Sequence, residues 1–333
     1  MKKLQLLAMG ILISAGATVN ASFEMMMFVE GNKINRYDPE NRVALGSFGE
    51  GELGMFLNPV IAADPTNQGV VAVLNGDGGI RRFNAYTGRY LGAVHTGVDP
   101  WFGNGPMRLE VLNNGNYLVT GWAGVGTATQ VSRIYSSTNG ALLSDMLPFG
   151  SGYMSLDSVQ GADGNIYSLN RFSSNGTSNF YSFVYTSTGS LLGVNQLAIG
   201  AAATRFGAIG RSGNKILITG HNHYEAIYHS LGITQPVNPV LWGFFNGGTF
   251  TGDIAQAHSR TYMHAWSNNA GTYTNRLNYF DPVTNYVSNN TFALPYTNAL
   301  GSMTIITAPE PGTLAALAAG AGWLLRRKKR RDR

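Results

Sequence analysis

One type of segment recurs five times along this chain at nearly constant spacing. It is an apolar stretch that ends in a polar turn and leads into a second stretch rich in β-branched and aromatic residues, as in MRLEVLNNGNYLVTGW. The turns are centred on Gly69, Gly115, Gly164, Gly213 and Ser259, at intervals of 46, 49, 49 and 46 residues. A period of this length indicates equivalent units that pack against their neighbours.

Each unit continues with a third apolar stretch, a tight turn and a fourth stretch, as in IRRFNAYTGRYLGAV and VSRIYSSTNGALLSD. Thr-Gly and Asn-Gly supply the positive φ that a tight reversal needs. The corresponding segment AIYHSLGITQPVNPVLW departs from this pattern. With 43 glycines, 32 Tyr and Phe residues (16 + 16) and no long apolar pattern at helical spacing, the chain is predicted to be all-β. Four short antiparallel strands in 45–50 residues predict a blade of a β-propeller.

The two ends of the repeat region complement each other. The segment from residue 23 to residue 48 has a second, third and fourth strand but no first, whereas residues 298–308 form a first strand with nothing after it. If this last strand pairs beside residues 23–30, the ring closes without a free edge. We therefore expect a six-bladed β-propeller with ring closure between the N- and C-terminal strands. Seven blades and an open β-solenoid are the alternatives.

The units resemble the repeats of six-bladed NHL-type and streptogramin-lyase-like propellers. The stretches GADGNIYSL, RFNAYTGRYLG and RYDPENRVALG carry the resemblance, with a glycine turn, an apolar-Tyr strand and an aromatic strand that ends in a tight turn. The resemblance covers most of residues 23–307. Its motifs specify a fold and no particular chemistry.

The N-terminus has the features of a secretory signal peptide. Lys2 and Lys3 precede an apolar run over residues 4–17, and Val19-Asn20-Ala21 forms a small-residue exit. We expect cleavage after Ala21. The alternative, an uncleaved anchor, is disfavoured because the run is shorter than the ~20 residues of a spanning helix. Cysteine is absent, so disulfides and thiolate sites are excluded.

The net positive charge of the chain comes from its two ends. Residues 326–333 contain seven basic residues and Asp332, a net charge of +6 (7 − 1). The stretch from residue 22 to residue 308 has 14 basic and 16 acidic residues, a net charge of −2. Binding to nucleic acid requires basic residues gathered on a folded face, so the sequence predicts no nucleic-acid partner.

The C-terminus consists of three parts in order. Pro309-Glu310-Pro311 comes first, residues 312–325 are mostly apolar, and residues 326–331 are all basic. This layout resembles the PEP-CTERM sorting signal of Gram-negative bacteria, although Asp332 and Arg333 trail the basic cluster. The resemblance implies recognition by an exosortase-type processing enzyme, a transient inner-membrane anchor through a transmembrane helix, and delivery to the cell surface or the exopolysaccharide matrix. An ordinary tail anchor is the alternative.

These segments divide the chain into three parts. Residues 1–21 are the predicted signal peptide, residues 22–307 the propeller, and residues 308–333 the sorting signal. Exported propellers bind ligands mostly at one mouth of the central channel, where the loops after the second strands meet those between blades. A channel-mouth ligand site is therefore the first place to expect function.

Aromatic and polar residues gather in the loops predicted at that mouth. Rings that stack on the apolar face of a sugar, beside groups that bond its hydroxyls, are typical of carbohydrate sites. The candidate ligand-binding residues are Trp101, Trp122, Arg171, His221 and Trp266. Packing of these aromatics between adjacent blades is the alternative interpretation.

The stretch His221-Asn222-His223-Tyr224-Glu225 is the candidate for catalysis. In an extended chain His221, His223 and Glu225 face one side, as an acid–base cluster or a metal-ligand set would. Streptogramin-lyase-like propellers also use histidine on this face, so a lyase or hydrolase is the alternative function. An ordinary polar loop is the simpler interpretation, and we predict no metal and no cofactor.

Enzyme motifs are otherwise missing from the sequence, which has no G-x-S-x-G, no H-E-x-x-H and no P-loop. The sequence leaves catalysis open and favours a non-enzymatic protein. We expect an exported protein of the surface or extracellular matrix, with polysaccharide as the candidate ligand.

Overall fold

The computed structural model describes the chain in stretches separated by short gaps. They are residues 22–53, 59–75, 77–96, 108–122, 130–146, 153–174, 177–196, 205–221, 225–229, 250–256, 260–269, 272–281, 286–287, 292–296 and 302–309. Every regular element in these stretches is a β-strand, and none is a helix. The predicted signal peptide and almost all of the predicted sorting signal lie outside them. Within the described part of the chain we find no helix long and apolar enough to span a bilayer.

The strands of the described residues form antiparallel sheets in which sequence neighbours pair. Sheet A contains β24 (Met303–Pro309), β1 (Ser22–Glu30), β2 (Lys33–Asp38) and β3 (Val43–Phe48). Sheet B contains β4 (Val60–Ala63), β5 (Val70–Leu74), β6 (Gly79–Asn84) and β7 (Tyr90–His95). Sheet C contains β8 (Arg108–Val111), β9 (Tyr117–Trp122), β10 (Gln130–Tyr135) and β11 (Leu142–Met146).

The remaining sheets follow the same plan. Sheet D contains β12 (Tyr153–Gln160), β13 (Ile166–Ser174), β14 (Thr177–Tyr185) and β15 (Leu191–Gln196). Sheet E contains β16 (Arg205–Ser212), β17 (Lys215–His221) and β18 (Glu225–His229). Sheet F contains β19 (Phe250–Gln256), β20 (Thr261–Asn269), β21 (Thr272–Asp281) and β22 (Tyr286–Val287), and β23 (Phe292–Ala293) also pairs with β21.

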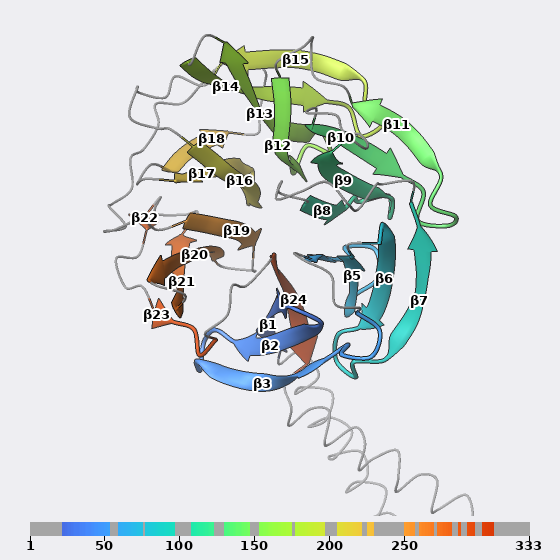
Figure 1. Ribbon diagram of the computed structural model, residues 1–333, viewed down its shortest axis with the longest axis vertical. Coiled ribbons are helices and arrows are strands. Elements are labelled where there is room, and N and C mark those ends of the chain that lie inside the picture. The colour runs from blue at the N-terminus through green and yellow to red at the C-terminus, as the bar shows by residue number, and fades with distance from the viewer. Residues whose placement is uncertain are drawn as a thin grey trace, which may run out of the picture.

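The sheets are arranged as a β-propeller, which confirms the expected all-β propeller class. The first strand of each sheet lies nearest the centre and the fourth strands β3, β7, β11 and β15 lie on the perimeter (Figure 1). Around the centre, β4 contacts β8, β8 contacts β12, β12 contacts β16, β16 contacts β19, β19 contacts β24, and β24 contacts β4. The first strands therefore enclose a central channel.

The predicted pairing of the chain's two ends is confirmed. β24 pairs antiparallel with β1, from Ser22 opposite Pro309 to Phe28 opposite Met303. The same strand also bonds to sheet B, because the Ser302 hydroxyl donates to the Ile61 carbonyl and accepts from the Ile61 N–H. The Thr304 hydroxyl accepts from the N–H of Ala63 in the same way. β24 is thus held to one neighbour by its backbone and to the other by its side chains.

The glycines that mark the repeat have the positive φ that a tight turn requires. Gly69, Gly115, Gly164 and Gly213 have φ values of 80°, 84°, 81° and 61°. L-residues with a side chain rarely adopt these angles, so glycine is favoured at the turn. The constant spacing of the repeat is therefore the spacing of the hairpin turns between first and second strands.

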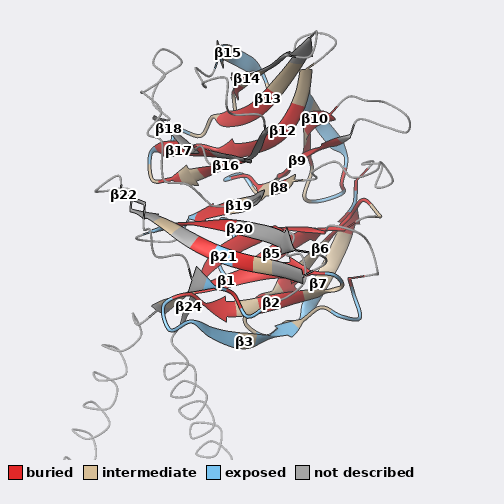
Figure 2. Ribbon diagram, turned by 60° about the vertical axis from the view of Figure 1, so that its left-hand side comes forward, coloured by how far each residue is buried: buried red, intermediate tan, exposed pale blue. Residues whose placement is uncertain are grey.

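The core consists of layers of apolar side chains between adjacent sheets. Figure 2 shows the buried residues along the strands that contribute to it. Phe28, Phe83 and Phe183 are fully buried in three of these layers. The layer between sheets C and D is partly polar. Hydroxyl groups contact one another there at 2.7–3.5 Å, and they belong to Thr120, Ser132, Ser155, Ser158 and Ser168.

Strand pairing defines two faces of the propeller. In sheet D, Gln160 pairs with Ile166 and Tyr185 pairs with Leu191 at one end, which we call the turn face. At the other end Tyr153 pairs with Phe172, and we call this the loop face. Second strands begin at the turn face and end at the loop face.

Candidate functional site

Three first strands carry a charged side chain at the same place in the repeat. Arg108 is on β8, Asp157 on β12 and Asp253 on β19. Their partners on the second strands are Thr120, Leu169 and His264, each five residues after the centre of a repeat turn. Because first strands line the channel, these charges lie near the propeller axis rather than on its rim.

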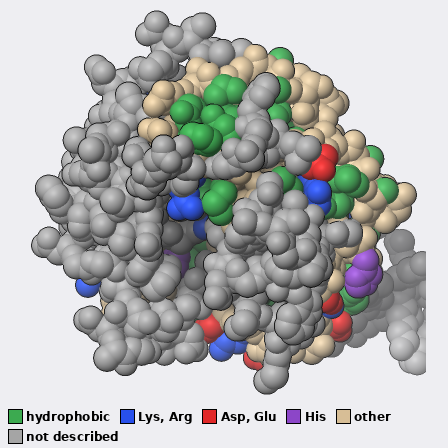
Figure 3. Space-filling model, turned by 45° about the horizontal axis from the view of Figure 1, so that its top comes forward, with side chains coloured by type: hydrophobic (Ala, Val, Ile, Leu, Met, Phe, Trp, Pro, Cys, Tyr) green, Lys and Arg blue, Asp and Glu red, His purple; other side chains and the backbone are tan. Residues whose placement is uncertain are grey.

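The first strands surround a cavity of about 210 Å³. Apolar side chains such as Val159 and Ile209 line part of it, together with a polar set that consists of Arg108, Glu110, Asp157, Arg211, Asp253 and Gln256. Figure 3 shows Lys and Arg side chains beside a hollow near the middle of one face. A cavity of this size and polarity has room for several waters or for one small polar ligand.

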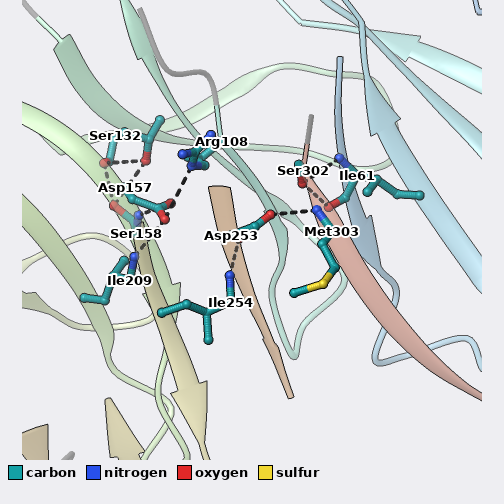
Figure 4. A network of polar contacts seen from close by, with 11 residues as sticks. Ile61, Arg108, Ser132, Asp157, Ser158, Ile209, Asp253, Ile254, Ser302 and Met303 are labelled. Carbon is teal, nitrogen blue, oxygen red and sulfur yellow. Dashed lines mark hydrogen bonds and ion pairs between the residues drawn. The ribbon is translucent and has the colours of Figure 1, made fainter. Parts of the chain in front are cut away.

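Asp157 joins sheet D to sheet E. Its Oδ1 accepts the N–H of Ser158 at 2.8 Å, and its Oδ2 accepts the N–H of Ile209 on β16 at 2.9 Å. The pairing of β12 with β13 shifts register between Ser155 and Asp157, and this bulge re-aims the carboxylate. The Nε of Arg108 lies 3.5 Å from the same Oδ2 (Figure 4).

Asp253 repeats this arrangement between sheets F and A. Its Oδ1 accepts the N–H of Ile254 at 2.8 Å and its Oδ2 accepts the N–H of Met303 on β24 at 2.9 Å (Figure 4). A register shift between Thr251 and Asp253 again precedes the aspartate. Both aspartates therefore use one oxygen atom to bind their own strand and the other to bind the first strand of the next sheet.

Burial dominates the titration of these carboxyl groups. It raises the pKa of Asp157 to about 7, while the nearby Arg108 guanidinium and the two backbone N–H donors favour the ionised form. Burial also raises the pKa of Asp253, and Arg108 again opposes the shift. Arg108 is thus the cation that both carboxyl groups share.

Glu110 lies closer to the turn face and accepts fewer backbone hydrogen bonds than the two aspartates. One of its oxygens, Oε1, accepts the N–H of Gln160 at 3.2 Å. Burial and the charge of Asp157 raise its pKa to about 8, against the opposing effects of the Gln160 N–H and Arg211. Glu110 is therefore a carboxyl group that holds its proton at neutral pH and lines the cavity, so it can donate a hydrogen bond to a ligand.

We expect replacement of Glu110 by glutamine to stabilise the protein more as the pH rises. The pKa of Glu110 is raised in the folded state, so its contribution to stability is fully present below about pH 4.5 and is lost as the pH rises through about 8. Glutamine keeps the acceptor for the Gln160 N–H and removes the ionisation. Between pH 5 and pH 9 the stability difference, variant minus wild type, should grow by roughly 4 kcal/mol and the Tm difference by several degrees, because a pKa raised from 4.5 to about 8 is worth about 1.4 kcal/mol per pH unit between those values.

Thermal melts of E110Q and of the wild type across this pH range measure the effect. E50Q is the matched control, because Glu50 is exposed and outside the channel. A Tm difference for E110Q that stays constant from pH 5 to pH 9 would contradict the prediction.

The polar side chains that line the cavity are hydrogen-bonding groups. Among the described residues, no group of three or more His, Asp or Glu side chains is placed to hold a metal ion. The channel instead offers carboxyl, guanidinium and amide groups between apolar walls. Planar polar groups of this kind bond hydroxyls well, as a sugar requires.

The structure places the predicted ligand-binding residues only in part. Trp122, His221 and Trp266 lie on second strands near their loop-face ends, and these are backbone positions. Arg171 lies at the corresponding end of β13, where its Nη2 contacts the Met154 Sδ at 3.3 Å. Trp101 lies outside the described residues. The convergence of these side chains therefore remains a prediction.

The structure likewise places the candidate catalytic residues only in part. His221 ends β17 and Glu225 begins β18, with Thr219 paired to Glu225 across the two strands. His223 lies in the gap between them, outside the described residues. The hypothesis that His221, His223 and Glu225 act together remains open.

The sequence-based candidates are residues of the predicted loops, and they do not include the charged residues of the channel. A signal for them was present. Arg108, Asp157 and Asp253 interrupt apolar first strands six or seven residues before the centre of the repeat turn. A charge on the innermost strand of a propeller has only the channel or the neighbouring sheet to face, so this regularity would have identified them.

The comparisons bear on the fold alone. No family model matches the chain, and a search of curated proteins gives no match. Among solved structures, the chain is similar to the β-propeller domain of Cps50 (Swd1) from Myceliophteria thermophila, with a TM-score of 0.50 and 8% identity, over 86% of this chain and 90% of that one. At this identity the likeness shows the fold and no function, and the chain is a β-propeller.

Proposed function

We propose that this protein is an exported propeller of the cell surface or extracellular matrix that binds polysaccharide and is not an enzyme. The observation that carries the proposal is the pairing of Ser22 with Pro309. The folded sheet begins at the residue after the predicted signal cleavage site and ends at the first residue of Pro309-Glu310-Pro311. Both predicted sorting segments therefore flank the closed ring, where processing enzymes can reach them without unfolding it.

We further propose that the propeller has six blades. Among the described first strands, the contacts of β4, β8, β12, β16, β19 and β24 form a closed cycle, which supports this number. Sheet E has three strands in the described part of the chain. Its fourth strand would come from residues 230–249, where the repeat pattern of the sequence is weakest.

Localisation tests the export part of this proposal. In Gram-negative cells that contain an exosortase-type enzyme, the mature protein should fractionate with the surface or matrix and lack both the signal peptide and the tail. Cells without that enzyme should retain the tail-bearing form in the inner membrane. Recovery of the uncleaved chain from the cytoplasm of either strain would contradict export and sorting.

Polysaccharide is the ligand class favoured by the channel chemistry. Glu110, Arg211 and Gln256 present a carboxyl, a guanidinium and an amide group to the cavity. Trp122 ends β9 and Trp266 lies in the loop-face half of β20, where ring stacking would add affinity and sugar selectivity. A glycan array and a pull-down with exopolysaccharide from the producing cells test for binding.

Replacing Trp122 or Trp266 by alanine should weaken glycan binding about tenfold or more and leave the Tm nearly unchanged, because a stacking ring contributes to the complex and not to the fold. Binding curves and thermal melts of each variant measure both effects. W323A is the control, because Trp323 lies in the predicted tail. A stability loss on the order of 3–5 kcal/mol in both variants, with no glycan bound by the wild type, would assign these rings to packing and contradict the carbohydrate proposal.

A lyase or hydrolase is the second candidate function, and Glu110 is the observation in its favour. Its pKa of about 8 suits a general acid at neutral pH. Against catalysis, Asp157 and Asp253 each accept two backbone N–H bonds and are committed to holding the sheets together. Release of reducing or unsaturated ends from a bound glycan, abolished in E110Q, would establish the enzyme in place of the binding protein.

A further inference from the structure

The exposed large apolar side chains of the described residues all lie on fourth strands. They belong to β3, β7, β11 and β15, which form the perimeter of the propeller (Figure 1), and Figure 2 shows the exposed residues along β3. The set consists of Val43, Tyr90, Leu142, Leu143, Leu191, Leu192 and Val194. Single exposed apolar residues are ordinary on protein surfaces, but confinement to one strand of each sheet is not.

Their position within the strand is also constant. Val43, Tyr90, Leu142 and Leu191 are each the first residue of a fourth strand, directly after the turn from the third. Leu143 and Leu192 follow as second residues and are 55% and 44% exposed. We call these six residues the apolar rim. Because fourth strands start at the turn face, the apolar rim follows the edge of that face in four neighbouring sheets.

Both ends of the described chain leave the propeller at the same face. Ser22 and Pro309 pair at the end of sheet A where Asp38 pairs with Val43. The turn of the adjacent sheet B also reaches this point, since the Tyr86 hydroxyl donates to the Thr307 carbonyl at 2.7 Å. Whatever follows Pro309 in the sequence therefore starts from the side of the propeller that carries the apolar rim.

The sequence after Pro309 has the chemistry of a membrane anchor. Residues 312–325 are mostly apolar, and seven of the last eight residues are basic. We propose that the apolar rim rests on the surface of the phospholipid bilayer while the tail holds the protein there, with the turn face toward the lipid. This inference rests on the proposed membrane-anchored intermediate and adds to it a defined orientation of the propeller.

The charges near the apolar rim fit a lipid surface of either charge. Glu40, Arg42, Arg89 and Asp163 are exposed in the turns of this face and are of mixed sign. They provide neither strong attraction to anionic headgroups nor strong repulsion. Apolar side chains that enter the boundary between headgroups and acyl chains supply the contact, so it should not require anionic lipid.

The absence of native cysteine makes the test direct, because a single introduced cysteine is the sole labelling site. Val43 begins β3 at the turn face, and Glu50 lies two residues beyond the opposite end of the same strand. Both residues are exposed. Full-length V43C, L143C and E50C are each labelled with a fluorophore and reconstituted into phosphatidylcholine vesicles with or without phosphatidylglycerol. Quenching by brominated phosphatidylcholine reports contact with lipid.

We expect labels at Val43 and Leu143 to be quenched at least about twofold more than the label at Glu50, in both lipid mixtures, as for side chains inserted in the interface. Flotation of the vesicles separates the two levels of the proposal. Protein that does not float with the vesicles overturns the anchored intermediate itself. Protein that floats with all three labels equally unquenched overturns the lipid contact and leaves the anchor intact.

A second copy of the chain is the competing occupant of the apolar rim. Two exposed edge strands can pair with each other, and this would bring labels on different copies together. Self-quenching of the Val43 label that grows with protein density, without quenching by brominated lipid, would assign the rim to self-association and overturn the inference. Unchanged melts of the three labelled variants would show that the comparison is made on folded protein.

Discussion

Removal of β24 is expected to unfold the whole domain rather than one sheet. A chain that stops before Ser302 loses seven residue pairs with β1, the hydroxyl contacts to Ile61 and Ala63, and the N–H that Asp253 accepts. The truncation also exposes core residues that pack in the same two layers as β24. Among them are Met26 and Met27, which are both fully buried in the intact protein. The cost should exceed about 5 kcal/mol, which is comparable with the total stability of a typical domain.

Circular dichroism melts and size-exclusion chromatography measure this loss. A chain that stops after Pro309 is the matched control and should melt within about 2 °C of the full-length protein, because the sheet is then complete. A circular permutant tests closure in a second way. Linking Pro309 to Ser22 and opening the exposed turn at Thr138 and Asn139 should keep the fold, since the natural ends already lie side by side. Cooperative melting of the chain without β24 near the wild-type Tm would contradict the closure argument.

Replacing Asp157 by alanine is the substitution with the next largest expected effect. The carboxylate is 5% exposed and accepts N–H groups from Ser158 and from Ile209 in the next sheet, beside the Arg108 guanidinium. Alanine leaves these donors without that acceptor and leaves a cation near the axis without its counter-charge. Breaking a buried pair in this way costs about 3–5 kcal/mol. Urea or thermal unfolding measures the loss.

Asparagine at position 157 is the matched control. Its amide oxygen retains one acceptor, so D157N should lose less stability than D157A. D253A should behave like D157A in direction, because Asp253 bonds the Met303 N–H in the same arrangement. The R108M substitution should destabilise D157N less than it destabilises the wild type, because D157N already lacks the carboxylate charge that Arg108 neutralises. Equal stability of D157A and the wild type would show that the N–H groups find other acceptors.

Much of the fold was predictable because its signals are local. A hairpin turn with positive φ needs glycine, so Gly69, Gly115, Gly164 and Gly213 mark the repeat in the sequence as they mark it in space. The strands on either side of each turn are recognisable as apolar runs, because most of their residues are buried. The incomplete first unit and the isolated last strand also predicted that β24 would pair with β1, and this required only the counting of strands.

The candidate site was less predictable, and the loops and the channel illustrate why. Trp122 and Trp266 were selected by residue type and by their place after a second strand, which is local information. Asp157 and Asp253 matter because of atoms 52 and 50 residues further along the chain, the N–H groups of Ile209 and Met303. Such a contact depends on how two sheets stack and on the bulge that re-aims the carboxylate.

The sequence by itself thus determined the strands, the turns and the closure of the ring, because each depends on residues close together in the chain or on the repeat itself. Only the tertiary structure decided which side chains meet at the axis and which remain exposed on the perimeter. Both depend on how the sheets stack around the axis, with the first strand of each sheet at the channel and the fourth strand at the perimeter. Glu110 acquires its raised pKa from its burial and from the charge of Asp157 on the next sheet, and Leu143 its exposure from its place on an outermost strand.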